Sequence, residues 1–354
     1  MNDIEEDFKS VNQLPETSPE FIDPWMPYTL IDAYRERTPI EYVAKGIFKL
    51  PSVNIIYGAP GCLKSFIMAD FALCTASGQS WLPPAPWQNK TNGIEVMTCQ
   101  TMWLDFDMGT SSTHERIEAL ARGKNLPEDT PFYYYSMPQP WLDGSKPESS
   151  GMLTLRAQNL GIKVIIIDNL GNVSGGVDEN SGAMIQVMSN FRQLSEETGA
   201  AVILIHHQRK GNGITGRAGD SLRGHSSIEA AIDLALQVDR DEDILTIKST
   251  KTRGVDVLPF SAAFTYQHKK NGDLESAKFY GLEIEDNNSN IAIMREITTT
   301  LTGKTMNKTE LTNAVKTTLA SVGINRIRNT IDKMTADKTI KTRAGNRGGL
   351  IYNL

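Results

Sequence analysis

The stretch GAPGCLKS, residues 58–65, brings together residue types that bind phosphate groups. It departs from the phosphate-loop pattern G-x-x-x-x-G-K-[ST] at one position, because Leu63 stands where the pattern has glycine. In a phosphate loop, Lys64 would reach the β- and γ-phosphates of a nucleotide, and the Ser65 hydroxyl would bind magnesium. The alternative is a glycine-rich turn that ends in Lys-Ser by chance.

The residues on either side of this stretch favour the phosphate loop. VNIIYG (53–58) is typical of a buried strand, and KSFIMADFALCTAS (64–77) has a helical pattern. A phosphate loop needs this context, because backbone N–H groups and a helix N-terminus must face the anion. The residues expected to contact the nucleotide are Gly58, Ala59, Pro60, Gly61, Cys62, Leu63, Lys64, Ser65 and Phe66.

A second candidate for magnesium binding follows another apolar run. KVIIIDN (163–169) is typical of a buried strand, and it ends in Asp168. An acid at the carboxyl end of a parallel strand emerges beside a phosphate loop, where it can order a magnesium ion together with Ser65. Taken alone, Asp168 is equally consistent with a helix cap.

A third acidic position offers a group that could polarise the attacking water. TMWLDFDMG (101–109) ends a predicted strand with Asp105 and Asp107. Two residues apart, both side chains are expected on one face of an extended strand, and either carboxylate could take a proton from water. The alternative is a solvated strand end.

The elements that must position these residues alternate along the chain. FYYYS (132–136) and AVILIHH (201–207) add further predicted strands, and residues 179–199 have helical spacing with Gly199 as the stop. Short buried strands that alternate with helices predict an α/β fold with a mostly parallel sheet. Four further predicted strands extend it as consecutive antiparallel strands, at residues 233–239, 243–253, 258–267 and 277–285.

The C-terminal end has a different texture. A polar linker is predicted at 285–290, followed by helices at 295–301, 307–323 and 324–338 and a hairpin at 339–354. Asn307 and Glu310 form a candidate capping box. Three helices and a two-stranded tail outline a winged helix. Residues 291–354 carry 11 Lys and Arg against 4 Asp and Glu, a net charge of +7, whereas residues 1–290 carry 25 against 38, a net charge of −13.

Length and composition bound the broad class of protein. A chain of 354 residues predicts a main domain and something smaller. We therefore expect an N-terminal arm (1–40), an ATPase-sized domain (41–284), the linker (285–290) and a basic domain (291–354). Three irregularly placed cysteines favour a reducing cytoplasm over a disulfide framework or a zinc site. The acidic N-terminus is no signal peptide, and no run is long and apolar enough to predict a membrane span.

The order of these parts resembles that of the RecA-fold hexameric ATPases, particularly the RepA-type helicases and related ATPases of plasmids and phages. The resemblance covers roughly residues 40–270. It rests on the stretches GAPGCLKS, LDFDMG, VIIIDNLGNVSGGVDEN, ETGAAVILIHHQRKG, DSLRGHSSIEAAIDLALQV and IKSTKTRG. The resemblance implies a RecA-like P-loop ATPase core that uses ATP and Mg²⁺. It also implies that Leu63 is tolerated before the loop lysine, and that Asp107 rather than Asp105 is the catalytic acid, although family members often carry Glu there.

Further site residues are implied by the resemblance. His206 and His207 end a predicted strand where such ATPases place a polar sensor of the γ-phosphate, and His207 is taken as that sensor. Lys251 and Arg253 match a basic pair that enters the neighbouring subunit's active site in RecA-fold rings. Without the resemblance, a surface histidine and exposed charges on an edge strand explain these residues equally well.

Two basic groups of residues are candidates for DNA contacts. The glycine-rich segment 208–224 is expected to follow a phosphate backbone without reading sequence, and in RecA-type rings the loops here face the central channel. The basic C-terminal domain is expected to contact DNA or a neighbouring protomer. The residues concerned are Arg209, Lys210, Arg217 and Arg223 in the first group, and Arg326, Arg328, Lys333, Arg343 and Arg347 in the second.

The function that the sequence favours is an ATP-dependent, ring-forming helicase or translocase on single-stranded DNA, serving replication of a phage or plasmid. The expected partners are single-stranded DNA, further copies of the chain in a hexameric ring, and a replication initiator or a primase, with no membrane. Two alternatives stay open. One is a RecA-fold regulatory ATPase that remodels protein, and the other is a DNA-binding initiator for which nucleotide is an assembly switch.

Overall fold

The structure is a computed structural model, and it describes most of the chain beyond the first 26 residues. The described ranges are 27–84, 93–178, 181–207, 226–241, 243–254, 256–282, 287–320, 322–336, 338–344 and 349–354. The chain divides into two compact units, residues 1–40 and residues 41–354. In the first unit, the short helix α1 (Leu30–Tyr34) begins with a capping box between Thr29 and Asp32. Within the described ranges, no helix has the length and apolar character that a membrane crossing requires.

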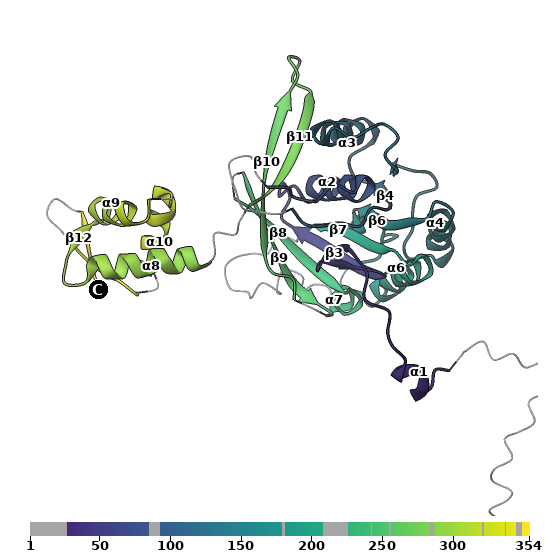
Figure 1. The fold of residues 1–354 in the computed structure, drawn as a ribbon, viewed down its shortest axis with the longest axis horizontal. Helices are drawn as coiled ribbons and strands as arrows, with labels where there is room; N and C mark the ends of the chain where they lie inside the picture. Colours follow the sequence, from purple (N-terminus) through teal and green to yellow (C-terminus); the bar gives the residue numbers. More distant parts are fainter. Residues whose placement is uncertain are drawn as a thin grey trace, which may run out of the picture. The chain divides into compact units, whose positions relative to one another are not determined.

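A nine-stranded sheet forms the centre of the second unit (Figure 1). Six of its strands are mutually parallel, and the pairing order across the sheet is β11-β10-β9-β8-β3-β7-β6-β4-β5. The parallel strands are β3 (Ser52–Gly58), β4 (Gln100–Asp105), β5 (Phe132–Ser136), β6 (Ile162–Asp168), β7 (Ala201–His207) and β8 (Leu234–Asp241). The fold is therefore the predicted RecA-like α/β core.

Helices cover both faces of this sheet. On one face, α2 (Lys64–Ser77) and α3 (Thr110–Lys124) pack over a core that contains Ile56, Trp103 and Ile203. On the other face lie α4 (Pro147–Asn159), α5 (Leu170–Val173), α6 (Met184–Thr198) and α7 (Ser226–Ala231). The central strands are buried on both faces, which explains their nearly continuous apolar sequence. Gly199 ends α6 in the left-handed conformation, as predicted.

Three antiparallel strands extend the sheet beyond β8. They are β9 (Ile244–Thr252), β10 (Phe260–His268) and β11 (Leu274–Leu282). The prediction that the antiparallel part starts at residue 233 was wrong, because β8 pairs with β3 in parallel. A parallel strand has to be reached by a crossover, and the described helix α7 precedes β8 directly. A small hairpin of β1 (Tyr42–Ala44) and β2 (Phe48–Lys49) precedes β3.

The C-terminal residues form three helices and a small antiparallel sheet around a separate core that includes Ile297, Leu311 and Ile331. The helices are α8 (Asn287–Leu301), α9 (Lys308–Thr318) and α10 (Ile324–Ala336), and the sheet has the order β12 (Met306–Asn307), β14 (Leu350–Asn353), β13 (Lys341–Ala344). The predicted capping box at Asn307 and Glu310 is present. The predicted linker 285–290 was partly wrong, since α8 begins at Asn287. Asn and Ser are favoured at helix starts, where they resemble linker residues.

Candidate active site

The predicted phosphate loop connects β3 to α2, and its backbone has the form that such a loop needs. Gly61 has φ of 80°, and Leu63 has φ of 61° and ψ of 23°, the left-handed region that glycine favours. Leu63 therefore adopts the conformation that the usual glycine would take. The Lys64 ammonium is buried and donates to the Gly58 and Ala59 carbonyl oxygens, both at 3.0 Å.

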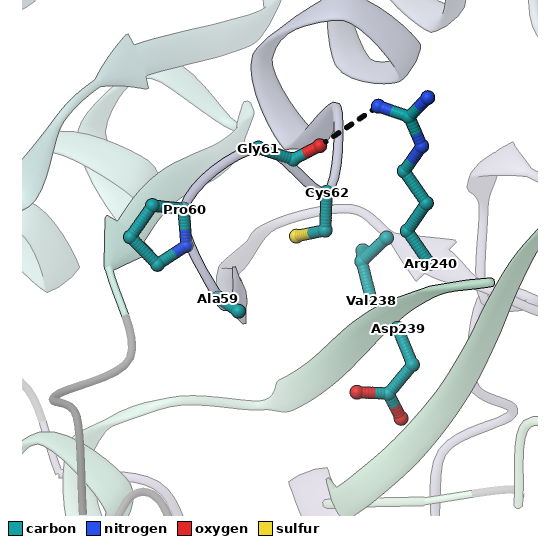
Figure 2. Close-up of a pocket in the computed structure, with 7 residues that line it drawn as sticks. All are labelled: Ala59, Pro60, Gly61, Cys62, Val238, Asp239 and Arg240. Carbon is teal, nitrogen blue, oxygen red and sulfur yellow. Dashed lines mark hydrogen bonds between the residues drawn. The ribbon is translucent and has the colours of Figure 1, made fainter. Parts of the chain in front are cut away.

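The end of β8 borders the loop on one side (Figure 2). A side chain at Gly58 would collide with the Val238 carbonyl oxygen, so only glycine fits this close approach. Across the cavity from Ala59, Pro60 and Cys62, the Arg240 guanidinium donates to the Gly61 carbonyl at 3.1 Å. The same guanidinium lies over the Phe264 ring, 5.1 Å from its centroid. The antiparallel extension is thereby tied to the phosphate loop.

Ser65 and Asp168 meet at the N-terminus of α2, as predicted for a magnesium site. The Ser65 hydroxyl hydrogen-bonds to the Asp168 carboxylate. Asp168 is almost fully buried, and its Oδ1 has no hydrogen-bond partner. Burial raises the pKa of Asp168 to about 6, and the nearby carboxylates of Asp107 and Asp105 act in the same direction.

These features fit a magnesium ion held together with nucleotide phosphates. An unpartnered buried carboxylate oxygen beside a hydroxyl is a hard-oxygen environment of the kind that Mg²⁺ prefers. Among the described residues, no group of three or more His, Cys, Asp or Glu could hold a metal alone. Mg²⁺ in nucleotide sites typically takes only one or two protein ligands, because phosphates and water supply the rest.

Asp105 and Asp107 do not share a face of a strand, so that prediction was wrong. β4 ends at Asp105, and the chain then turns, which buries Phe106 and exposes Asp107. Asp105 accepts hydrogen bonds from the hydroxyls of Thr113 (2.5 Å) and Ser136 (2.8 Å) and from two backbone N–H groups. Burial opposes ionisation of Asp105, but these donors keep its pKa below the ordinary value. Asp105 therefore holds the turn, and Asp107 is the exposed carboxylate.

Arg116 on α3 completes the acidic cluster and was missed from the sequence. Its guanidinium lies over the Phe66 ring, 5.1 Å from the centroid, and the side chain lines a small cavity with Asp105 and Asp168. Burial lowers the pKa of Arg116, while the charges of Asp168, Asp105 and Asp107 act against that shift. The available signal was its position three residues after Thr113, at the border of the buried face of α3.

The two histidines lie next to the phosphate loop. In the β3–β7 pairing, His206 is level with Tyr57 and His207 is level with Gly58. His206 is buried and His207 is exposed at the strand end. His207 is thus placed at the sheet edge where a γ-phosphate sensor was expected, beside Asp168 at the end of the neighbouring strand β6.

Lys251 and Arg253 lie at the opposite end of the sheet from the phosphate loop. Thr252 pairs with Leu234, which pairs with Asn54, so this end of β9 is level with the start of β3. That position is four residues before Gly58, or about 13 Å along the strand direction. The Arg253 guanidinium donates to the Ala230 carbonyl, ahead of β8. Only Lys251 lies within the strand, and desolvation and the Arg253 charge lower its pKa.

The predicted DNA-binding residues are only partly described. Arg328 and Lys333 on α10 and Arg343 on β13 are exposed, and Arg326 is half-buried. Lys308 pairs with Asp332 and reduces the basic character of α10 locally. The remaining predicted residues, Arg209, Lys210, Arg217, Arg223 and Arg347, lie outside the described residues.

Comparison with known proteins agrees with this site. A family profile described as "AAA domain" matches residues 23–213, more than half of the chain. The chain therefore belongs to the AAA domain family, and its phosphate loop, Ser65 and Asp168 are those of a P-loop ATPase. No curated protein matches the chain. Among solved structures, the ATPase domain of a phage helicase is similar, with a TM-score of 0.45 and 15% identity, over 66% of this chain and 85% of that chain.

Proposed function

We propose that the protein is an ATP-driven helicase or translocase of the RepA type, which acts on single-stranded DNA as a ring in the replication of a phage or plasmid. ATP and Mg²⁺ bind at the phosphate loop, with Ser65 and Asp168 as the metal-binding residues. Asp107 takes the proton of the attacking water, and His207 contacts the γ-phosphate.

The position of Arg253 is the single observation that supports the ring most directly. Lys251 and Arg253 lie at the start of β3, whereas the phosphate loop follows its end. A basic pair there cannot serve the chain's own γ-phosphate, but it can serve a neighbour in a head-to-tail ring. An arginine supplied in this way stabilises the charge that develops during phosphoryl transfer.

DNA contacts are assigned to the segment 208–224 and to the basic C-terminal domain. The exposed Arg328 and Lys333 share the helix α10, and Arg343 lies on the adjacent hairpin. Helix and hairpin together are a suitable arrangement for phosphate contacts by a winged helix. A primase or an initiator, the further expected partners, would meet the ring on the surfaces that DNA does not use.

The test is ATP hydrolysis by the full chain with and without single-stranded DNA, with Lys64→Ala as the inactive control. A DNA motor should hydrolyse ATP faster on single-stranded DNA, and Lys64→Ala should abolish turnover because it removes the cation that offsets phosphate charge. Strand displacement from a forked duplex then separates a helicase from a translocase.

The two alternatives give different results in the same test. A protein-remodelling ATPase turns over ATP at the same rate with and without single-stranded DNA. An initiator that uses nucleotide as a switch binds DNA in a nucleotide-dependent way but hydrolyses ATP only slowly. Undiminished hydrolysis by Lys64→Ala would refute the phosphate-loop assignment on which all three functions rest.

A further inference from the structure

Asn172, on α5, contacts the turn that carries Asp107. Its side-chain amide donates to the Phe106 carbonyl oxygen at 2.8 Å and to the Asp107 carboxylate oxygen Oδ1 at 3.4 Å. One amide group thus holds both the backbone immediately before Asp107 and the Asp107 side chain. Asn172 lies four residues after Asp168, so it connects the two acidic positions of the site.

The backbone of Asn172 is itself fixed from two sides. Its N–H donates to the side-chain oxygen of Asn169, which caps α5, at 3.1 Å. Its carbonyl accepts a hydrogen bond from the Trp141 indole at 2.8 Å, and the Trp141 ring packs edge-on against Phe106, with centroids 4.9 Å apart. The amide of Asn172 is therefore presented to Asp107 from a rigid support, although its side chain is exposed.

We infer that Asn172 is a positioning residue, which orients the Asp107 carboxylate for proton transfer from the attacking water. The inference rests on the proposed catalytic role of Asp107. Because the amide engages Oδ1, the other carboxylate oxygen, Oδ2, is the one that accepts the proton. The amide itself neither gains nor loses a proton.

Orientation matters here because Asp107 is exposed and would otherwise rotate. A carboxylate that is a general base must lie within hydrogen-bond distance of the water, and a displacement of about 1 Å costs on the order of a hundredfold in rate. The only other hydrogen bond that the structure shows for Asp107 in the described residues is from its backbone N–H to Asp105. That bond fixes the main chain but leaves the side chain to Asn172.

Three other charged groups act on Asp107 and have to be considered in any pH experiment. They are Asp105 at the end of β4, Asp168 at the end of β6 and Arg116 on α3. Two negative charges and one positive charge already surround the carboxylate. A fourth charge at position 172 would therefore shift the balance against ionisation.

The experiment measures kcat and KM for MgATP across pH with the full-length protein, without DNA. Asn172→Ala should lower kcat about tenfold or more and leave KM within about twofold, because the residue is distant from the phosphates. Asn172→Asp, which keeps the shape but adds a negative charge, should also move the acidic limb of the kcat profile to higher pH. The matched control Asn313→Asp, an exposed asparagine on α9, should behave as wild type.

A double-mutant comparison separates positioning from a general structural effect. In the Asp107→Asn background, Asn172→Ala should cause no further loss of kcat, since the group that it positions is already gone. Equal losses in both backgrounds, unchanged kcat in Asn172→Ala, or a fully active Asp107→Asn protein would overturn the inference. None of these results depends on DNA, so they are distinct from failure of the helicase proposal.

Discussion

At the scale of single residues, the buried carboxylate of Asp168 is costly to ionise until a cation binds. Burial raises its pKa to about 6, whereas an unfolded chain has an aspartate near the ordinary value of 3.8. Between these two values the folded protein holds a proton that the unfolded protein has released. Stability must therefore fall as pH rises through this window, and it stays low above about pH 6.

Asp168→Asn should remove this pH dependence from the nucleotide-free protein. The variant cannot ionise, so its advantage over wild type in the free energy of unfolding should be small at pH 4 and reach about 2–3 kcal/mol at pH 7.5. Urea denaturation at a series of pH values measures the difference. Parallel curves for the two proteins would contradict it. The same variant should bind MgATP more weakly, because the metal-binding carboxylate is lost.

Leu63 replaces the usual glycine and adopts glycine's conformation, so Leu63→Gly should be nearly neutral. The left-handed backbone costs a leucine about 1–2 kcal/mol. Glycine relieves that cost, but it removes partly buried packing against the core and adds freedom to the unfolded chain. We expect a change in unfolding free energy within about 1 kcal/mol and unchanged nucleotide affinity. Leu63→Val is the contrasting variant and should destabilise, because β-branched residues tolerate this region poorly. Equal stability of the two variants would contradict the conformational argument.

The two neighbouring acids should respond differently to the same substitution. Asp105 is an acceptor for four donors, so Asp105→Asn directs an NH₂ group at some of them and should cost about 2 kcal/mol of stability. Asp107→Asn should leave stability and nucleotide binding intact and lower kcat. Thermal denaturation together with kcat resolves the pair. A larger kcat loss from Asp105→Asn at unchanged stability would reverse the assignment.

At the scale of elements, the close contact between α3 and β11 depends on a glycine inside the helix. A side chain at Gly123 would collide with the Ala277 carbonyl oxygen. Gly123→Ala should therefore force α3 away from β11 and destabilise by about 1–3 kcal/mol or more. Gly151, inside α4, faces open space, so Gly151→Ala should stabilise by about 0.5–1 kcal/mol. Denaturation midpoints of the two variants test the contrast, and equal shifts would refute it.

Periodicity predicted the central strands well, because buried parallel strands are short, apolar runs with clear ends. β3, β5, β6 and β7 lie within one residue of their predicted limits. The direction of β8 could not be predicted, since parallel or antiparallel pairing depends on the crossover before it. The helix α3 escaped notice because its mean character is polar and only one stripe, including Thr113, Ile117 and Leu120, is buried.

The site was predictable where function imposes local spacing and was not where tertiary folding brings residues together. The phosphate loop and the acid at the end of β6 are local patterns, and the structure brings Ser65 and Asp168 into contact. Arg116 and Asn172 belong to no local motif. Each reaches Asp107 from a different element, so only the packing of α3 and α5 at the sheet edge reveals them.

At the scale of the whole molecule, the sheet separates two parts of one proposed catalytic apparatus. The phosphate loop, Asp107 and His207 lie at the carboxyl edge of the parallel strands, and Arg253 lies at the opposite edge. If Arg253 acts on a neighbour, a single chain lacks part of its own site. Hydrolysis then requires assembly, and a strictly monomeric preparation should be inactive.

Mixing two inactive variants tests this arrangement. Arg253→Ala and Lys64→Ala should each hydrolyse ATP poorly, because the first lacks the arginine it gives to a neighbour and the second lacks the loop lysine. When the two proteins assemble together, some interfaces combine an intact loop from one variant with an intact Arg253 from the other. Those interfaces should restore part of the activity, in proportion to how often they form. Arg192→Ala is a suitable control for the same edge of the sheet, because Arg192 pairs with Asp233 and belongs to the fold rather than to the proposed interface chemistry. Its mixture with Lys64→Ala should show no gain beyond the Arg192→Ala activity. Full activity of Arg253→Ala alone, or turnover by isolated monomers, would refute a shared site.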